Sequence, residues 1–476
     1  MSKQPALVAI DLGAESCRVS LLHWRDGNAE IRMVRRFGNG PVERDGGFYW
    51  DLERICAELE AGLRQCAEMA PEGVASIGVA GWAVDYLRLG PDGKPLGPPH
   101  CYRDPRHAAA MEAVHTILPA DRLYAQTGVQ IQPINTVYQL YADKTAGVPA
   151  SAPWVNLPEY ILHWLGAPRV AEYTNATHTG LVDPETRQWA AEIFAALGLD
   201  LSAAPELVQP GTVLGPVRAD LRRLPAFAET KLIAPACHDT ASAIAGIPTQ
   251  QGSWAYISSG TWSLVGVVDA KTHRSAEACT AGFTNLGAAG GRVLFHCGLV
   301  GMWLLRQCLN TWENTRGWEF GELIAEARKL PEPDTPLDLD DAGFVPPGDM
   351  PARMNRQRRS RGLPPLPEGC DAAPYYANLI FHSLAHRYAG VIREIEALTG
   401  KPIERIFVVG GGNRNEYLNA LTEQATGLPV ECCAAESSTL GNFALQWARL
   451  EQDSDGVGEA AIAARACKLI EIAMHA

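Results

Sequence analysis

The sequence predicts an α/β protein of two domains, and three observations support this fold class. The chain has 476 residues, which is too long for one hydrophobic core and is typical of two or three domains. Apolar runs typical of strands alternate with segments whose apolar residues recur at helical spacing. A strand–turn–strand pattern near the start returns in the second half of the chain. We therefore expect a duplicated α/β core in two lobes with a central cleft.

The first half begins with a hairpin or meander over residues 7–37. Asp51 is placed to cap a helix whose apolar face carries Leu52, Ile55, Leu59 and Leu63. Residues 74–80 are typical of a buried strand, and residues 86–89 of a strand that ends in a turn. This order indicates a small mixed or antiparallel sheet followed by alternating helix and strand.

The second half repeats the opening pattern over residues 245–268, so we place the domain boundary near 246–248. The patterns that follow predict an apolar helix over 299–309, a looser segment over 331–370, a long helix over 375–399 and a strand over 405–409. Within the looser segment, a basic run amid proline and glycine is interpreted as a solvated loop, with a mobile lid or a contact to an anionic ligand as the alternative; it consists of Arg353, Arg356, Arg358, Arg359 and Arg361.

Composition and charge narrow the function. Hydrophobic residues make up 47% of the chain and charged residues 20%, as in ordinary soluble proteins. The net charge of −13 argues against a nucleic-acid-binding face, which would be basic. The start lacks the apolar core of a signal peptide, and no run approaches about 18 apolar residues. We expect a cytoplasmic protein that binds neither nucleic acid nor membrane, with twelve scattered cysteines that are reduced and mostly buried.

Three glycine- and serine-rich turns have the chemistry to hold a polyphosphate. They are Asp11–Arg18, Ser258–Ser263 and Gly410–Gly412, and each follows an apolar run. Backbone N–H groups in such turns bind phosphate oxygens, and successive glycines let a flat ligand approach the backbone. Each is also compatible with a plain structural turn. None completes a Walker A or G-x-G-x-x-G pattern, which excludes the P-loop and Rossmann interpretations.

Asp239 lies between the first two of these turns, after the apolar run 232–237. Its carboxylate is a candidate general base for a substrate hydroxyl, and such a base need not have a high pKa because the proton transfers late. The alternative is a helix N-cap for residues 240–245. Together with the phosphate-binding turns, the base indicates phosphoryl transfer from a nucleotide to an alcohol.

Trp82 and Asp85 follow the strand at 74–80 and place an indole beside a carboxylate. A sugar ring stacks on an aromatic face and its hydroxyls bind charged acceptors, so this pair is a candidate sugar site. The alternative is a core tryptophan next to a turn aspartate. Arg103, in the charged segment 102–106, is expected to line the same cleft.

In this order the motifs resemble the FGGY carbohydrate kinases over nearly the whole chain, and most specifically the rhamnulokinase members. The matching segments are Asp11–Ala14, Trp82–Tyr86, Tyr102–Asp104, Asn135–Leu140, Glu172–Thr177, His238–Ala243, Ser258–Leu264, Gly410–Gly412 and Ser438–Asn442. The resemblance implies the two-domain actin-like ATPase (ribonuclease H-like) fold. It also implies an N-terminal sugar-binding domain, 1–246, and a C-terminal nucleotide-binding domain, 247–476.

The resemblance further implies roles for individual residues. Asp239 is the proton acceptor, ATP is the phosphoryl donor, and Asp11 orients Mg²⁺ through water. The implied substrate-binding residues are Trp82, Ala83, Asp85, Arg103, His238, Asp239 and Thr240. The implied ATP-binding residues are Ala14, Glu15, Ser16, Cys17, Arg18, Ser259, Gly260, Thr261, Gln307, Gly410 and Gly411.

The chain departs from the family pattern mainly in the sugar half. Ala80-Gly81-Trp82-Ala83 stands where rhamnulokinases have Asp-Thr-Trp-Gly, so a carboxylate and a hydroxyl are lost and a methyl group is gained. Cys17 replaces a glycine of the first phosphate turn, and Glu159 replaces an aspartate. Segment 295–301 lacks an asparagine that relatives offer to substrate. Arg306 occupies the position of a nucleotide-contacting glutamine, so Gln307 is expected to take that role.

The resemblance implies a kinase for the O1 hydroxyl of a 6-deoxy-ketohexose, L-rhamnulose first, and we expect a monomer or homodimer. L-fuculose or another ketose is the runner-up, because residues 80–83 differ from the family pattern. A non-catalytic sugar-binding regulatory relative is the alternative from another class, and the intact Asp11 and Asp239 argue against it.

Overall fold

The computed structural model describes residues 5–25, 28–248, 252–434, 436–452 and 457–474. It groups the chain into two compact units, each assembled from segments that are distant in sequence. Unit 1 comprises residues 1–250, 268–295 and 436–476, and unit 2 comprises residues 251–267 and 296–435. The division into consecutive domains, 1–246 and 247–476, stays a prediction. Residues 249–251, next to the boundary predicted at 246–248, lie outside the described part of the chain.

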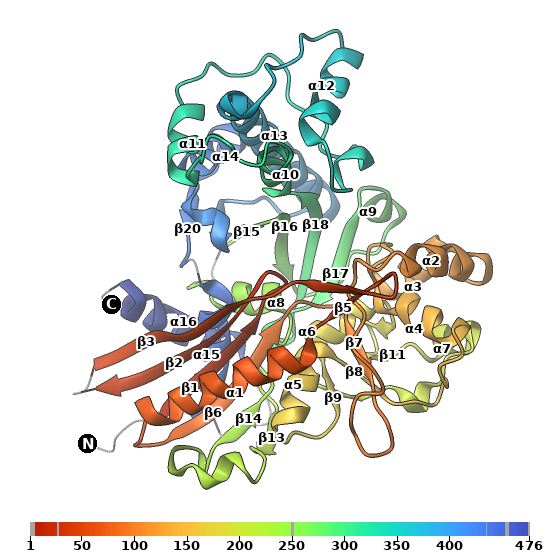
Figure 1. The fold of residues 1–476 in the computed structure, drawn as a ribbon, viewed down its shortest axis with the longest axis vertical. Helices are drawn as coiled ribbons and strands as arrows, with labels where there is room; N and C mark the ends of the chain where they lie inside the picture. The colour runs from red at the N-terminus through yellow and green to blue at the C-terminus, as the bar shows by residue number, and fades with distance from the viewer. Residues whose placement is uncertain (1–4, 26–27, 249–251, 435, 453–456, 475–476) are drawn as a thin grey trace. The chain divides into compact units, whose positions relative to one another are not determined.

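Unit 1 is built on a mixed six-stranded sheet with the order β13-β14-β6-β1-β2-β3. The first two strands of the chain form the predicted antiparallel hairpin, and β6 pairs in parallel with both β1 and β14. Figure 1 shows β1, β2, β3 and β6 side by side. The strands are β1 (Ala6–Leu12), β2 (Ser16–Arg25), β3 (Asn28–Gly38), β6 (Val74–Gly81), β13 (Val213–Pro216) and β14 (Lys231–Ile233).

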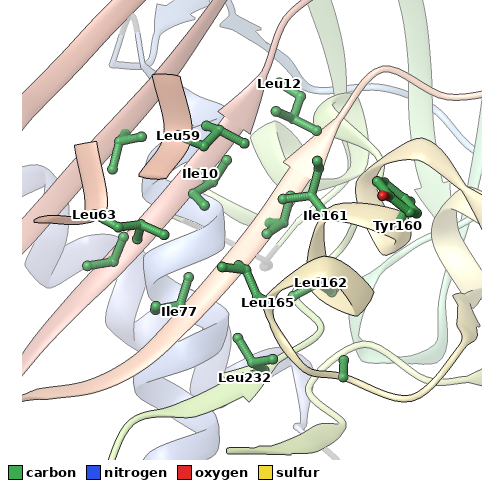
Figure 2. Packing of buried hydrophobic residues seen from close by; sticks show 14 of the residues in the cluster. Ile10, Leu12, Leu59, Leu63, Ile77, Tyr160, Ile161, Leu162, Leu165 and Leu232 are labelled. Carbon is green, nitrogen blue, oxygen red and sulfur yellow. The ribbon is translucent and has the colours of Figure 1, made fainter. Parts of the chain in front are cut away.

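Two helices, α1 (Leu52–Met69) and α5 (Leu157–Leu165), contribute to the main hydrophobic core of this sheet. The predicted cap is present, because the Asp51 side chain accepts a hydrogen bond from Arg54 N at 3.1 Å. Leu59 of α1 and Ile161 of α5 lie in one cluster with Ile77 of β6, as Figure 2 shows. Alternate residues of the strands supply the sheet side of this core.

A third helix, α15 (Ser437–Leu450), packs on β1 and β6 through polar side chains. Asn442 Nδ2 donates to Gly78 O at 3.2 Å, and Gln446 Nε2 donates to Val8 O at 3.0 Å. Ser76 Oγ donates to Gln446 Oε1 at 2.6 Å. A Cβ at Gly78 would collide with the Asn442 amide, so this position requires glycine. Residues distant in sequence therefore complete unit 1.

Unit 1 also contains further helices and small strand pairs. The helices are α2 (Arg106–Ile117), α3 (Ala120–Thr127), α4 (Thr136–Thr145), α6 (Tyr173–Ala176), α7 (Ala191–Leu197), α8 (Asp239–Ala245), α9 (Ala276–Thr280) and α16 (Glu459–Met474), with the 3₁₀ turn η1 (Thr177–Thr179). The strand pairs are β4 (Pro41–Arg44) with β5 (Gly47–Trp50), β7 (Tyr86–Arg88) with β8 (Trp154–Asn156), β9 (Val170–Glu172) with β12 (Glu206–Val208), and β10 (Val182–Asp183) with β11 (Gln188–Trp189).

A second six-stranded sheet has the order β17-β18-β16-β15-β19-β20. It repeats the first: an antiparallel hairpin, here β15 with β16, whose first strand pairs in parallel with β19, which in turn pairs in parallel with β20. This repeated pairing agrees with the predicted duplication of the α/β core. The strands are β15 (Trp254–Ser259), β16 (Trp262–Asp269), β17 (Phe283–Gly287), β18 (Val293–Val300), β19 (Arg405–Val409) and β20 (Val430–Cys432).

The helices of unit 2 are α10 (Trp303–Thr311), α11 (Phe320–Ala327), α12 (Met350–Ser360), α13 (Ala373–Thr399) and α14 (Glu416–Thr426). The predicted helix over 375–399 is confirmed by α13. The helix predicted over 299–309 was placed too early, because β18 continues to Val300. The end of β18 is both buried and apolar. An apolar run alone does not distinguish a buried strand from a helix.

The interpretation of the basic run as a loop was wrong, because most of it lies in α12. Asp349 begins this helix by accepting a hydrogen bond from Ala352 N at 3.0 Å. Arg353 donates to the carbonyl of Pro347 at 2.8 Å, and Arg358 donates to the carbonyl of Pro364 at 2.9 Å. These arginines therefore fix the proline-rich segments on either side of the helix.

Among the described helices, none has the length and apolar character needed to cross a membrane. The twelve cysteines are all free thiols, and seven of them are buried: Cys17, Cys66, Cys101, Cys237, Cys297, Cys308 and Cys370.

Candidate functional site

The residues predicted to bind sugar and to accept the proton meet at one edge of the unit 1 sheet. β1 and β6 are parallel, so their carboxyl ends lie at the same edge. Trp82 N donates to Leu12 O at 3.1 Å, and Gly81 N donates to Cys237 O at 2.8 Å. Gly81 also forms a parallel bridge with His238. The first phosphate turn, the Trp82 segment and the Asp239 segment are thus neighbours.

Asp11 is nearly buried at the end of β1 and holds two partners. Arg18 Nη1 donates to Asp11 Oδ2 at 2.7 Å, and Ser438 Oγ donates to the same oxygen at 2.7 Å. Arg18 also forms an ion pair with Glu436, with 3.3 Å between Nε and Oε2. Ser438 and Glu436 were not predicted as site residues. The segment Ser438–Asn442 was visible as a motif, but nothing in the sequence indicates that it packs beside Asp11.

Asp239 is the first residue of α8, and its side chain does not cap that helix. The capping position is His238, whose side chain makes no capping bond. Asp239 Oδ1 lies 3.3 Å from His238 Nε2 and accepts from Thr240 Oγ1 at 3.2 Å. Burial and the negative charge of Asp11 raise the pKa of Asp239 to about 7, although 36% of its side-chain surface remains exposed. A partly exposed carboxylate of this kind can accept a proton near neutral pH.

Asp85 is fully buried and accepts hydrogen bonds from two indoles and one amide. Trp50 Nε1 donates to Oδ2 at 2.5 Å, Trp82 Nε1 donates to Oδ2 at 2.9 Å, and Gln139 Nε2 donates to Oδ1 at 3.2 Å. Burial raises the pKa of Asp85 to about 7. The Trp50 and Trp82 rings lie 4.4 Å apart at a tilt of 44°. In this structure the carboxylate fixes the rings and has no exposed surface for a sugar hydroxyl.

The turn between Trp82 and Asp85 is strained at Val84, which has φ of 70° although it is buried and β-branched. Thr136 Oγ1 donates a hydrogen bond to the carbonyl oxygen of Val84 at 2.6 Å. Arg103 is exposed, with its guanidinium carbon 5.1 Å from the centre of the Tyr102 ring. The centre of the Tyr102 ring in turn lies 6.2 Å from the centre of the Trp50 ring. The structure therefore brings the segment at 102–103 to the same aromatic cluster.

The first phosphate turn is tight and mostly backbone. Gly13 is required, because a Cβ there would collide with Ser16 O. Ala14 and Ser16 are half-buried and Glu15 is exposed. Cys17, predicted to contact ATP, lies in β2 with a buried side chain, and burial raises the pKa of its thiol to about 12. Only its backbone is therefore available for such a contact.

In unit 2 the hairpin and the glycine triplet predicted to bind ATP are also neighbours. β15 and β19 end together, with Ser258 opposite Val409. Gly410 has φ of 84°, which favours glycine, and a Cβ at Gly412 would collide with the Ser259 side chain. A Cβ at Gly411 would meet no atom within 4 Å. Glycine is thus favoured at 410 by the backbone conformation and needed at 412 for packing. The backbone at Gly411 is open to a flat ligand.

The turn at Gly260 and Thr261 is hydrogen-bonded to the start of α10. Met302 N donates to Gly260 O at 3.0 Å, and Trp303 N donates to Thr261 O at 3.1 Å. Gln307, on the same helix, is buried, and its Oε1 accepts from Gly348 N at 3.2 Å. A nucleotide contact through this oxygen would therefore require it to leave Gly348 N.

The described residues contain no group of three or more His, Cys, Asp or Glu side chains placed to hold a metal ion. Mg²⁺ in phosphoryl-transfer sites is commonly bound by one or two carboxylates together with water and substrate phosphates. Asp11 suits such a contact through water, because both of its hydrogen bonds use Oδ2.

Both halves of the chain match one protein family. Residues 6–246 match the N-terminal domain of the FGGY family of carbohydrate kinases, and residues 255–449 match the C-terminal domain of that family. The chain is 33% identical to a rhamnulokinase of Bacteroides thetaiotaomicron, over 97% of this chain and 94% of that protein. It is 34% identical to a rhamnulokinase of Enterococcus faecalis, over 92% and 88%.

Solved structures show the same fold. A xylulose kinase from Lactobacillus acidophilus aligns with a TM-score of 0.76 at 15% identity, covering 99% of this chain and 97% of that chain. The glycerol kinase of Plasmodium falciparum with ADP aligns with a TM-score of 0.75 at 13% identity, covering 98% and 93%. The predicted two-domain α/β fold is confirmed by these alignments.

Proposed function

The chain belongs to the FGGY family of carbohydrate kinases, and we propose that it transfers the γ-phosphoryl group of ATP to the O1 hydroxyl of L-rhamnulose. Two of its relatives, each about one-third identical over nearly the whole chain, carry the name rhamnulokinase. The observation that carries the proposal is the placement of Asp239. The carboxylate of Asp239 is partly exposed and has a raised pKa, and it lies in the same unit as the Asp11 turn.

The residues at the unit 1 edge would hold the sugar and accept its proton. The O1 oxygen attacks the γ-phosphorus, the bond from that phosphorus to the β–γ bridging oxygen breaks, ADP leaves, and Asp239 takes the hydroxyl proton. The Trp82–Ala83 backbone and His238 are the proposed sugar contacts, with Thr240 and Arg103 beside them. Asp85 would act on the sugar indirectly by orienting the Trp82 ring.

Each unit by itself offers backbone groups that suit part of the nucleotide. Backbone N–H groups at Ala14–Arg18 and at Ser259–Thr261 suit phosphate oxygens, and the open backbone at Gly411 suits a flat adenosine group. When bound, Mg²⁺ would neutralise charge on the phosphates, with Asp11 holding one of its waters. ATP and Mg²⁺ are thus the proposed cofactors.

Another ketose, such as L-fuculose, is the second candidate, because the structure buries the two altered positions before Trp82. Ala80 is opposite Asp11 in the parallel register, and Gly81 lies against Leu12 and Pro158. The carboxylate and hydroxyl that the family has here are replaced by an apolar, tightly packed pair.

ADP release measured in a coupled assay tests the proposal. The enzyme is given ATP and Mg²⁺ with L-rhamnulose, with L-fuculose, with other ketoses, and with no sugar. We expect the highest kcat/KM for L-rhamnulose. A higher value for another ketose would reassign the substrate, and ADP release that no sugar increases would favour a non-catalytic sugar-binding relative.

A further inference from the structure

We propose that His178 is a positioning residue for the reaction: it holds His238 in the tautomer that donates a hydrogen bond to the catalytic Asp239. This inference rests on the proposed role of Asp239 as base. His178 Nε2 lies 3.1 Å from His238 Nδ1, and the two ring centres are 4.0 Å apart. The other nitrogen of His238, Nε2, lies 3.3 Å from Asp239 Oδ1. His178, His238 and Asp239 therefore form a continuous chain of side-chain contacts.

The direction of the hydrogen bonds follows from what each group can donate. An ionised carboxylate only accepts, so His238 Nε2 must carry a hydrogen to bind Asp239. A neutral imidazole has a single N–H, so His238 Nδ1 is then an acceptor. The nitrogen that faces it, His178 Nε2, must supply the hydrogen. His178 thereby selects the tautomer of His238.

The backbone around both rings is fixed independently of this contact. Glu172 Oε2 accepts from Cys237 N at 2.7 Å and from Thr174 Oγ1 at 2.5 Å, and Thr174 Oγ1 accepts from His238 N at 3.3 Å. Thr177 Oγ1, next to His178, accepts from Gly287 N at 2.9 Å. Because these bonds hold the main chain, the loss of the His178 N–H removes the tautomer restraint without releasing the segment.

A donor at Asp239 stabilises the ionised carboxylate. Two other charged groups act on this carboxylate: Asp11, which raises its pKa, and Arg18, which lowers it. Loss of the His238 donor removes a further lowering influence, so the pKa of Asp239 rises and less of the base is ionised near neutral pH. The acidic limb of the rate profile then moves to higher pH.

The experiment compares His178→Phe, which keeps a ring but has no donor, with His178→Gln, whose amide N–H reaches a similar position. His386→Phe, at an exposed residue of α13, is the matched control. The pH dependence of kcat/KM for the ketose is measured for each variant. We expect the acidic limb to move upward in His178→Phe, with kcat at pH 6.5 lowered about tenfold, and to stay near that of the unaltered enzyme in His178→Gln.

An unchanged pH profile in folded His178→Phe overturns the inference, as does an equal shift in His178→Gln. The KM for ATP should stay unchanged, and an increase in it would indicate general damage instead of a lost tautomer restraint. If His178→Phe does not fold, His178→Asn replaces it, because its amide is too short to reach His238. The variant Asp239→Asn separates the two claims: if it retains turnover, the proposed base is wrong, whatever the histidine variants show.

Discussion

At the scale of single residues, the two aspartates predicted at the sugar site have different environments. Asp239 keeps an exposed face, whereas Asp85 is enclosed by two indoles and an amide. The sequence shows both as aspartates that follow apolar runs. Their solvent access depends on Trp50 and Gln139, which are distant in sequence, so sequence alone could not separate a base from a buried anchor.

Asp239→Asn should lower kcat by about 10²- to 10⁴-fold, the usual effect of losing a general base, and leave ATP binding intact. Asparagine has nearly the same shape but cannot accept the hydroxyl proton. Steady-state kinetics and ATP titration give the two quantities. Asp371→Asn, the same change at a carboxylate with 92% of its side chain exposed, is the control and should be neutral. Turnover of Asp239→Asn near that of the unaltered enzyme would remove this residue from the mechanism.

The environment of Glu159 predicts that the free energy of unfolding depends on pH. Glu159 is fully buried beside Glu172. Its burial, and to a smaller extent the charge of Glu172, raise the pKa of Glu159 to about 8 from an unfolded value near 4.5. The folded state therefore holds a proton that the unfolded state has released. Its stabilising contribution is complete below about pH 4.5 and is lost as the pH rises through about 8.

Glu159→Gln cannot titrate, so its free energy of unfolding should fall less between pH 5 and pH 8 than that of the unaltered protein, by more than about 1 kcal/mol. Urea unfolding followed by tryptophan fluorescence measures this difference. Glu229→Gln, at an exposed residue, should leave the dependence unchanged. If both variants lose stability with pH as the unaltered protein does, Glu159 is ionised in the folded state.

At the scale of elements, strands, hairpins and capped helices were predicted well, and tightly packed contacts between elements were not. The segments that became β1, β2, β6, α1, α13 and β19 have clear periodicity or capping residues, which act locally. The end of β18 and the helix α12 were missed, because a buried strand resembles an apolar helix and an arginine-rich helix has little apolar periodicity.

Ala83→Gly should raise kcat/KM for L-rhamnulose, by about 10-fold, which is typical of one methyl group at a substrate pocket. Steady-state kinetics with several ketoses measure it. Restoring the family's threonine at the neighbouring Gly81 is blocked, because a Cβ there would lie 2.7 Å from Leu12 Cβ. An unchanged ranking of ketoses in Ala83→Gly would show that this segment does not set selectivity.

Gly441→Ala should destabilise the protein, because a Cβ at this position of α15 would collide with Ser242 O of α8. Overpacking of this kind costs about 1–3 kcal/mol. Gly390→Ala is the control, since its Cβ would approach only the flexible end of Arg387 in α13, and alanine favours a helix interior. Thermal unfolding should show opposite shifts. A neutral Gly441→Ala would mean that the two helices separate readily.

At the scale of the whole molecule, the duplicated α/β fold was predicted from motif order and is confirmed, whereas the composition of the compact units was not predicted. Contact with β1 and β6 places α15 in unit 1, although it lies far along the chain. No local pattern encodes this, because the packing depends on a glycine at 78 and amides at 442 and 446 that meet only in the folded state.

Binding of ketose together with a non-hydrolysable ATP analogue should reduce the radius of gyration, because a kinase must exclude water from its phosphoryl donor. Small-angle scattering measures the change. We expect the hinge at residues 244–250, of which 249 and 250 lie outside the described part of the chain. Asp239→Asn, which should bind both ligands, is expected to show the same reduction. An unchanged radius with both ligands bound would count strongly against closure.

The dependence of the first sheet on α15 has a consequence for biosynthesis. Val8 and Ile10 are translated early, yet the amides that contact their carbonyls are 438 and 432 residues further along. At about 5–20 residues per second, a ribosome needs tens of seconds to supply them. During that interval one face of β1 and β6 lacks its covering helix. The nascent chain is therefore exposed to misassembly at this face until α15 has been translated, when most of its residues have already been made.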